Sequence, residues 1–236
     1  MASLKFSIVI PTYNEAGGIE RLIRELDAVF KANALDGEII IVDDNSPDGT
    51  GAIVDRLAAE FPVRCVHRPG KMGLSSGVIA GWGVARPESV AVGAMDADFS
   101  HDITILPKMV RALEDGYGLA VGSRYVPGGG ITNWPWKRVV ISRVACTIAR
   151  PLTNIKDITS GYFLVRRDAL EDVKLDPIGF KIGLEVIAKA HYGKAIEIPY
   201  VFTDRVSGES KLNEKEVFNY LKQLRKLYAG RIFSSS

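Results

Sequence analysis

The feature that most constrains the fold is a repeated alternation of short apolar runs and helical segments through the first 125 residues. The apolar runs are rich in β-branched residues, as expected for strands, and lie at 5–11, 38–44, 63–68, 89–96 and 119–125. The expected helices between them lie at 17–31, 51–60, 73–85 and 105–116. Repeated β-α units predict an α/β fold, in which a mainly parallel central sheet carries helices on both faces.

The second half of the chain is less regular. A Gly/Pro/Trp-rich stretch at 126–136 predicts a loop, and a basic amphipathic helix is expected over 137–152. Further along, the pattern predicts strands at 157–167 and 195–205, and helices at 183–193 and 214–229.

Composition and charge narrow the function classes. The chain has 236 residues, 47% of them hydrophobic, and a net charge of +2, so nothing global indicates nucleic-acid binding. Charge is segregated, because residues 116–156 carry six basic side chains and no acidic one. The two cysteines, Cys65 and Cys146, form no CxxC motif and fit a reducing compartment. No signal-peptide pattern opens the chain, and no apolar stretch reaches the ~20 residues of a membrane span.

Polar residues follow four of the expected strands. They are Thr12 to Glu15, Asp43 and Asp44, Asp96 and Asp98, and Arg124. In open α/β sheets, ligands bind at the carboxyl ends of the strands, so these groups are expected to converge on one crevice.

Asp96 and Asp98 are the leading candidates for a metal site. Side chains two residues apart in an extended segment point the same way, and paired carboxylates suit Mg²⁺ or Mn²⁺. The alternative is a solvated acidic turn before the next helix, with Asp102 as its N-cap. His101 is expected to be a surface histidine.

Asp43 and Asp44 form a second acidic pair, which could accept hydrogen bonds from a ribose or a base edge. The alternative is an Asx-type turn in the sequence DDNSPDGT. No GxGxxG follows the first strand, which argues against NAD or FAD, and GGG at 128–130 is followed by no GK[ST].

Loop cations and tryptophans suggest contacts with phosphates and with a membrane. The loop DRVSGESK, with Arg205 and Lys211, is suited to close over phosphates. Trp134 and Trp136 beside basic residues suit either a membrane interface or ordinary packing of the loop.

Five motifs together resemble the dolichol-phosphate mannose synthases, which are family-2 glycosyltransferases with the GT-A fold. They are IVIPTYNE (8–15), IIIVDDNSPDGT (39–50), MDADFSH (95–101), GSRY (122–125) and DRVSGESKL (204–212). The resemblance covers roughly residues 5–228. It implies a single GT-A domain over 1–228, with a donor-binding half at about 1–125, an acceptor- and membrane-facing half at about 126–228, and a tail at 229–236.

The resemblance also implies roles for individual residues. The nucleoside of the donor would be held by Pro11, Tyr13, Glu15, Val42 and Asp44. Asp96, Ala97 and Asp98 would meet the diphosphate and its metal, and some relatives have Gln where this chain has Ser100. Arg124, Arg205 and Lys211 match positions that contact donor or acceptor phosphates, and with Asp98 they form the expected catalytic set. Arg138 and Lys181 are weaker matches.

The activity implied is inverting transfer of mannose from GDP-mannose to dolichyl or another polyprenyl phosphate, with Mg²⁺ or Mn²⁺. The enzyme would lie peripherally on the cytoplasmic face of a membrane, with or without an anchoring subunit, and would bind no nucleic acid. Three alternatives stay open: a UDP-glucose polyprenyl-phosphate glucosyltransferase, a non-catalytic nucleotide-sugar-binding subunit, and more distantly a nucleotidylyltransferase.

Overall fold

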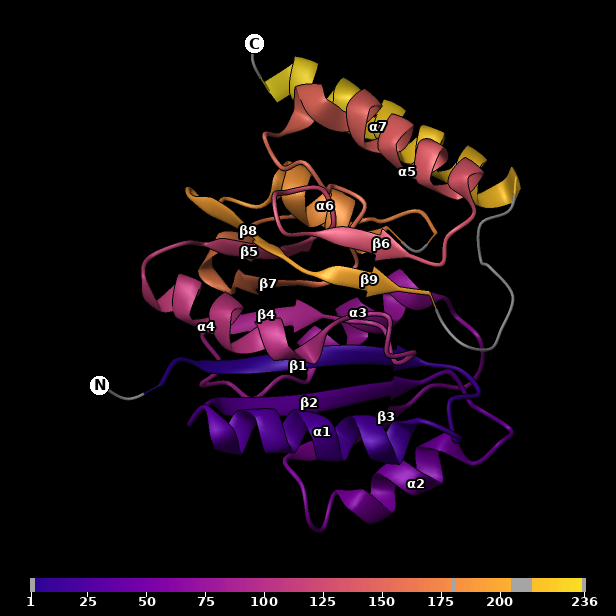
Figure 1. Ribbon diagram of the computed structural model, residues 1–236, viewed down its shortest axis with the longest axis vertical. Coiled ribbons are helices and arrows are strands. Elements are labelled where there is room, and N and C mark those ends of the chain that lie inside the picture. The colour runs from indigo at the N-terminus through magenta and orange to yellow at the C-terminus, as the bar shows by residue number, and fades with distance from the viewer. Residues whose placement is uncertain (1–2, 180, 205–213, 235–236) are drawn as a thin grey trace.

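A seven-stranded sheet forms the centre of the computed structural model, which describes residues 3–179, 181–204 and 214–234 (Figure 1). The strand order is β3-β2-β1-β4-β7-β5-β8. All neighbouring pairs are parallel except those of β7, which runs antiparallel to both β4 and β5. The strands are β1 (Lys5–Thr12), β2 (Asp36–Asp43), β3 (Val63–His67), β4 (Ala91–Ala94), β5 (Leu119–Ser123), β7 (Phe163–Arg166) and β8 (Ala195–Pro199).

Helices cover both faces of this sheet, as predicted. One apolar cluster joins alternate strand residues such as Ile8 and Ile39 to α1 (Ile19–Ala32), α2 (Thr50–Leu57) and α4 (Leu106–Glu114). The second joins the opposite strand faces, for example Val9 and Ile40, to the remaining helices. These are α3 (Leu74–Gly83), α5 (Trp136–Ala149), α6 (Ile182–Lys189) and α7 (Glu214–Ser234). Short 3₁₀ turns lie at Ile103–Ile105, Arg150–Leu152 and Asp168–Leu170.

Three expectations for the second half need correction. The predicted loop 126–136 contains a short strand, β6 (Gly130–Thr132), which pairs with β9 (Val201–Thr203) in a separate parallel ribbon. The predicted strand 195–205 is therefore divided into β8 and β9. It divides at Tyr200, whose N–H donates to Ser123 O and whose carbonyl accepts from the Gly130 N–H.

The predicted strand 157–167 begins only at Phe163. Residues before it form turns, because their polar groups bond locally: the Ser160 N–H donates to Asp157 O at 3.1 Å, and the Tyr162 N–H donates to Ser160 Oγ at 3.2 Å. Phe163 pairs with Ala94, the last residue of β4. The turn 157–162 therefore lies at the same edge as the carboxyl ends of β1, β2 and β4.

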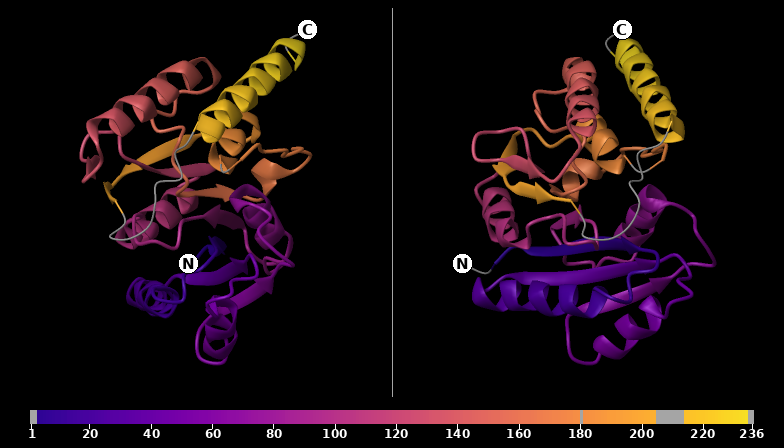
Figure 2. Two further views of the ribbon diagram at one scale, coloured as in Figure 1. Left: turned by 90° about the vertical axis from the view of Figure 1, so that its right-hand side faces the viewer. Right: turned by 45° about the vertical axis from the view of Figure 1, so that its right-hand side comes forward.

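Helices α5 and α7 lie together at the end of the molecule farthest from α1 and α2 (Figures 1 and 2). The Tyr220 hydroxyl on α7 donates to the carbonyl of Ala145 on α5 at 2.6 Å. α7 runs on to Ser234, through most of the segment expected as a tail. Among the described residues, no helix combines the length and the hydropathy that crossing a bilayer requires.

Gly93 in the middle of β4 provides a test of the sheet packing. A Cβ at this position would lie 2.4 Å from both the carbonyl oxygen of Phe163 and Leu164 Cδ2 on β7. Gly93→Ala is expected to lower the free energy of unfolding by about 1–3 kcal/mol, measured by urea denaturation. Gly83→Ala is the control, because a Cβ there meets nothing within 4 Å and should leave stability unchanged or slightly higher. Equal stabilities of the two variants would contradict the close contact between β4 and β7.

Candidate active site

The residues expected to hold a nucleoside gather at the carboxyl ends of β1 and β2. Pro11 and Val42 are cross-strand partners, and Tyr13 lies at the surface, 39% exposed, with Lys71 Nζ 4.3 Å from its ring centroid. The main-chain N–H of Glu15 donates to Thr50 Oγ1 at the start of α2. Val42 is fully buried beneath this edge, so it contributes packing here and has no exposed surface.

Asp44 holds a neighbouring loop in place. Its carboxylate forms a buried ion pair with Arg68 and accepts hydrogen bonds from the N–H groups of Met72 and Gly73, at 3.1 and 3.3 Å. The adjacent Asp43 accepts from Thr12 Oγ1 and from the N–H and hydroxyl of Ser46. Asp43 therefore forms the Asx-type turn that was the alternative for this pair. Asp44 instead holds the main chain of residues 72–73 at the edge of the sheet.

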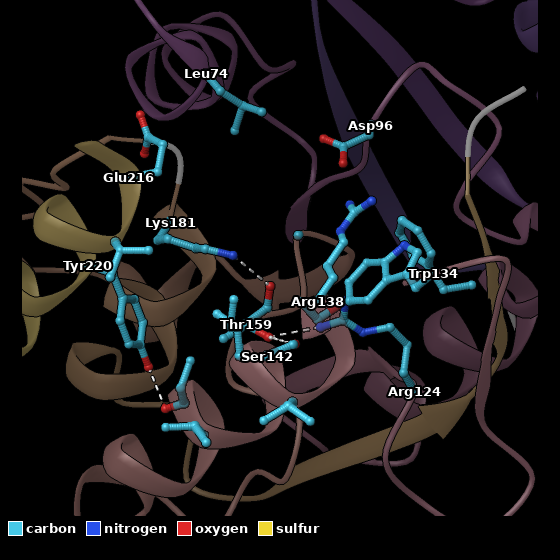
Figure 3. A pocket seen from close by; sticks show the side chains of 18 of the residues that line it. Leu74, Asp96, Arg124, Trp134, Arg138, Ser142, Thr159, Lys181, Glu216 and Tyr220 are labelled. Carbon is cyan, nitrogen blue, oxygen red and sulfur yellow. Dashed lines mark hydrogen bonds between the residues drawn. The ribbon is translucent and has the colours of Figure 1, made fainter. Parts of the chain in front are cut away.

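Asp96 and Asp98 follow β4 and both line one cavity of about 500 Å³. The Asp96 side chain is 36% exposed and faces this space (Figure 3). Asp98 Oδ1 accepts from the Ser100 hydroxyl at 2.5 Å and from its N–H at 3.2 Å, so Ser100 is turned toward Asp98. Ala97, between the two acids, is buried. Paired carboxylates fit a hard divalent cation such as Mg²⁺ or Mn²⁺.

His101 is buried, which corrects the expectation of a surface histidine. Only 4% of its surface is exposed, and its ring stacks on Tyr162 with centroids 5.1 Å apart. Its Nδ1 accepts a hydrogen bond from the Asp96 N–H at 3.0 Å, which fixes the loop that carries the acids. Burial lowers the pKa of His101, against the opposing effect of Asp96 and Asp98, so the imidazole is neutral at pH 7.

Arg124 is held by a buried carboxylate that the sequence patterns did not single out. Its Nε and Nη2 donate to the two oxygens of Asp157 at 2.7 and 2.6 Å, and its own N–H donates to Asp157 Oδ2. Nη2 also donates to Thr159 Oγ1. Burial would lower the pKa of Arg124, but Asp157 outweighs it and raises that pKa above its usual value. The turn-forming sequence DITSG was the available signal for this site.

Two further cations border the same cavity. Arg138 on α5 stacks on Trp134, with its guanidinium carbon 3.9 Å from the ring centroid, and pairs with Asp204. Lys181, just before α6, lines the cavity and points toward Thr159, whose carbonyl accepts from its Nζ at 3.5 Å (Figure 3). Trp134 packs against Phe202, as expected if this loop packs on the body of the protein. Trp136, by contrast, is 71% exposed. Arg205 and Lys211 lie outside the described residues.

The remaining wall of the cavity is mostly apolar and comes mainly from two helices, with Glu216 of α7 as its charged member. Val140, Ile141, Val144 and Ile148 on α5 face it, together with Val217 and Leu221 on α7. Each of these six side chains is between 39 and 50% exposed. The cavity thus joins a charged end at the sheet edge to an open apolar groove between α5 and α7.

The family model described as Glycosyl transferase family 2 matches residues 7–174. The chain belongs to glycosyl transferase family 2. The dolichol-phosphate mannosyltransferase of Pyrococcus furiosus is 42% identical over 231 residues, and that of Saccharomyces cerevisiae is 39% identical over 237. The polyprenol monophosphomannose synthase of Mycolicibacterium smegmatis is 40% identical over 221 residues. The resemblance inferred from the five motifs is therefore confirmed.

The lengths of these relatives differ. The three alignments cover 95%, 96% and 89% of this family-2 chain, in the order just given. They cover 64% of the Pyrococcus protein, just under two thirds of its length, and 88% and 82% of the other two.

Solved structures share the fold at low sequence identity. A mannosyltransferase from Pyrobaculum calidifontis in complex with GDP-Man and Mn²⁺ superposes with a TM-score of 0.64 at 19% identity, covering 97% of this chain and 64% of that one. Glucosyl-3-phosphoglycerate synthase from Mycobacterium tuberculosis with Mn²⁺ and UDP-glucose gives 0.65 at 18%, covering 97% and 79%. The expected α/β architecture of family 2 is confirmed.

The Arg124–Asp157 pair gives a prediction for stability. Asp157→Asn leaves a buried guanidinium without its counter-charge, so it is expected to lower the free energy of unfolding by about 3–5 kcal/mol. Asp168→Asn is the matched control, since Asp168 pairs with Arg166 at the surface and its loss should cost less than about 1 kcal/mol. Urea denaturation of both variants checks this, and equal losses would show that the buried pair is not the stronger one.

Proposed function

We propose that this family-2 chain is a dolichyl-phosphate β-D-mannosyltransferase, which moves mannose from GDP-mannose to dolichyl or another polyprenyl phosphate. The observation that carries the proposal is the form of the cavity. One end holds Asp96, Asp98 and three cations, with Glu216 at the start of α7 near Lys181, and the other is an open, mostly apolar groove (Figure 3). A long apolar chain with an anionic head matches this division of polar and apolar surface. The names of the curated relatives at 39–42% identity agree with it.

The acceptor phosphate would lie among the cations at the charged end. Arg124, Arg138 and Lys181 all border the cavity, and guanidinium groups bind phosphate oxygens with directional hydrogen bonds. Asp157 and Asp204 hold the two arginines in fixed positions before the ligand arrives. Such preorganisation reduces the entropy lost on binding. The isoprenoid chain would leave through the groove between α5 and α7.

The donor would approach from the carboxyl ends of β1 and β2. Pro11, Tyr13, Glu15 and Asp44 gather there, with Val42 packed below, and would surround the nucleoside. Asp96 and Asp98 would hold Mg²⁺ or Mn²⁺ near the diphosphate, with Ala97 between them. When bound, that ion would offset the negative charge that the leaving GDP gains. Arg205 and Lys211 are assigned to the same task, although both lie outside the described residues.

The chemistry is a single displacement. An oxygen of the acceptor phosphate attacks the anomeric carbon, the bond from that carbon to the diphosphate breaks, and the configuration inverts to the β-linked product. The phosphate is already anionic at neutral pH, so the attack requires no strong general base. His101 is not required as a base in this mechanism. Its Nδ1 accepts a hydrogen bond from the Asp96 N–H, and this contact positions the loop that carries the two acids.

The proposed location is the cytoplasmic face of a membrane, with peripheral contact. Trp136 is exposed next to Lys137 and Arg138, and α5 and α7 expose apolar side chains beside the groove. Tryptophan and basic residues together suit the headgroup region of a bilayer. An anchoring subunit is compatible with this arrangement. The donor-binding half would then be about 1–125 and the membrane-facing half about 126–228.

Transfer of radiolabelled sugar into an organic-extractable lipid tests the function. We expect label from GDP-mannose, in the presence of dolichyl phosphate and Mg²⁺ or Mn²⁺, and none from UDP-glucose. Asp98→Asn should lower kcat by about 10²-fold or more, as loss of transition-state charge stabilisation does. Asp115→Asn, at the exposed end of α4, is the control and should retain full activity.

Other results of the labelling experiment would support one of the alternative functions. Label from UDP-glucose alone would make the protein a glucosyltransferase of the same fold. Calorimetric binding of GDP without transfer to any polyprenyl phosphate would indicate a non-catalytic subunit. Full activity of a folded Asp98→Asn variant would remove the metal assignment.

Lys181 predicts a pH dependence for acceptor binding. Burial, with Arg124 nearby, lowers the pKa of Lys181 to about 8, so its ammonium is charged below that pH and neutral above it. The KM for polyprenyl phosphate is therefore expected to rise above about pH 8. Lys181→Arg keeps the charge and should flatten the rise, whereas Lys108→Arg on the exposed side of α4 should not change it. A rise that persists in Lys181→Arg would exclude Lys181 as its cause.

A further inference from the structure

A cluster of metal-ligating side chains lies away from the cavity, where α2 packs against the edge strand β3. Cys65 and His67 are two residues apart on β3 and share one face, and Asp55 on α2 lies opposite them. Potential ligand atoms of the three residues all lie within 4.8 Å of one another. His67 Nε2 is 3.0 and 3.1 Å from the two oxygens of Asp55. In the described part of the chain, this is the one such group of three.

A glycine on α2 makes room for the imidazole of His67. Gly51 stands one turn before Asp55 on α2, and a Cβ there would lie 2.7 Å from Cε1 and 2.9 Å from Nδ1 of His67. Any other residue at 51 would push the imidazole away from the helix and from Asp55. The close approach of helix and ring therefore depends on glycine.

The geometry points to a site for a soft divalent cation of the Zn²⁺ class, bound by the Cys65 thiolate, the His67 imidazole and the Asp55 carboxylate. This donor set differs from the hard oxygen pair Asp96 and Asp98, because sulfur and imidazole ligands favour zinc over magnesium or manganese. The thiolate and the carboxylate together balance the charge of the ion. Three protein ligands leave a fourth tetrahedral position for water.

The distances require only a small adjustment. Zinc–ligand bonds of about 2.0–2.3 Å place neighbouring ligand atoms roughly 3–4 Å apart. The Asp55 and His67 atoms already meet this spacing. Their side chains are 56% and 53% exposed, so they can rotate toward the sulfur without displacing core residues.

The surroundings of the thiol favour a cation. Burial, together with the nearby carboxylates of Asp55 and Asp43, raises the pKa of Cys65 to about 12. The thiol is therefore protonated in the free protein, and binding of the ion releases that proton to solvent. The negative potential that disfavours the thiolate alone stabilises a bound dication. Such an ion would fasten α2 to the edge of the sheet.

Titration of the full-length, reduced protein with CoCl₂ tests the site, because cobalt reports its ligands by absorption. We expect a thiolate-to-cobalt charge-transfer band that ZnCl₂ abolishes by displacement. Cys65→Ser should remove the band, and Cys146→Ser, at the other cysteine, should retain it. His67→Gln and Asp55→Asn should weaken binding by more than the ~10–100-fold typical of losing an outer-shell partner. His191→Gln is the control for a surface histidine.

Two outcomes would overturn the assignment. One is a folded wild-type protein that gives no charge-transfer band at saturating cobalt. The other is a band of unchanged affinity in Cys65→Ser or in the Asp55→Asn and His67→Gln variants. Cobalt bound only at Asp96 and Asp98 gives no thiolate band, so the readout separates the two sites. Circular dichroism of each metal-free variant ensures that a lost band reflects a lost ligand.

Discussion

A buried guanidinium is tolerated only beside a carboxylate, and the charged end of the cavity depends on the pair that meets this condition, Arg124 and Asp157. The pair does not stand alone. Glu197 on β8 accepts hydrogen bonds from the Asp157 N–H and from Ser123 Oγ, at 3.0 and 2.7 Å. Thr159 links the guanidinium to α5, since its hydroxyl lies 3.4 Å from Ser142 Oγ. One connected network thus sets the positions of β5, β8, the 157–162 turn and α5 around the cavity.

The two ends of the cavity differ in how firmly their side chains are held. The charged end is built from groups fixed by ion pairs and hydrogen bonds, which suits recognition of phosphates at defined positions. The apolar end is formed by helix side chains that are about half exposed, which suits a chain of repeating isoprenoid units that needs no directional contact. The Asp55–Cys65–His67 cluster lies on β3, the outermost strand next to β2, and a bound ion would act on stability there.

Much of the fold could be predicted from the sequence, because its first half has strong local signals. Within residues 38–44, the apolar residues 39–42 run without alternation, as expected for a strand buried on both faces, and this predicted β2 correctly. The position of Asp96 and Asp98 at the strand edge followed from the same reasoning. What failed depended on contacts between distant segments. The β6–β9 pairing, the burial of His101 against Tyr162, and the partnership of Arg124 with Asp157 join residues that no local pattern relates.

The reversed direction of β7 determines which segment borders the cavity at the carboxyl ends of the parallel strands. An antiparallel strand enters the sheet at the edge where its parallel neighbours leave, so the turn 157–162 reaches the ligand edge from its amino-terminal side. The loops that leave β1 and β2 form the part of this edge around Asp43 and Asp44, whereas the entry turn borders the cavity at Thr159, Ser160 and Gly161, beside Asp96 and Asp98. Substitutions in the entry turn can therefore change the charged end of the cavity while the loops after β1 and β2 stay the same.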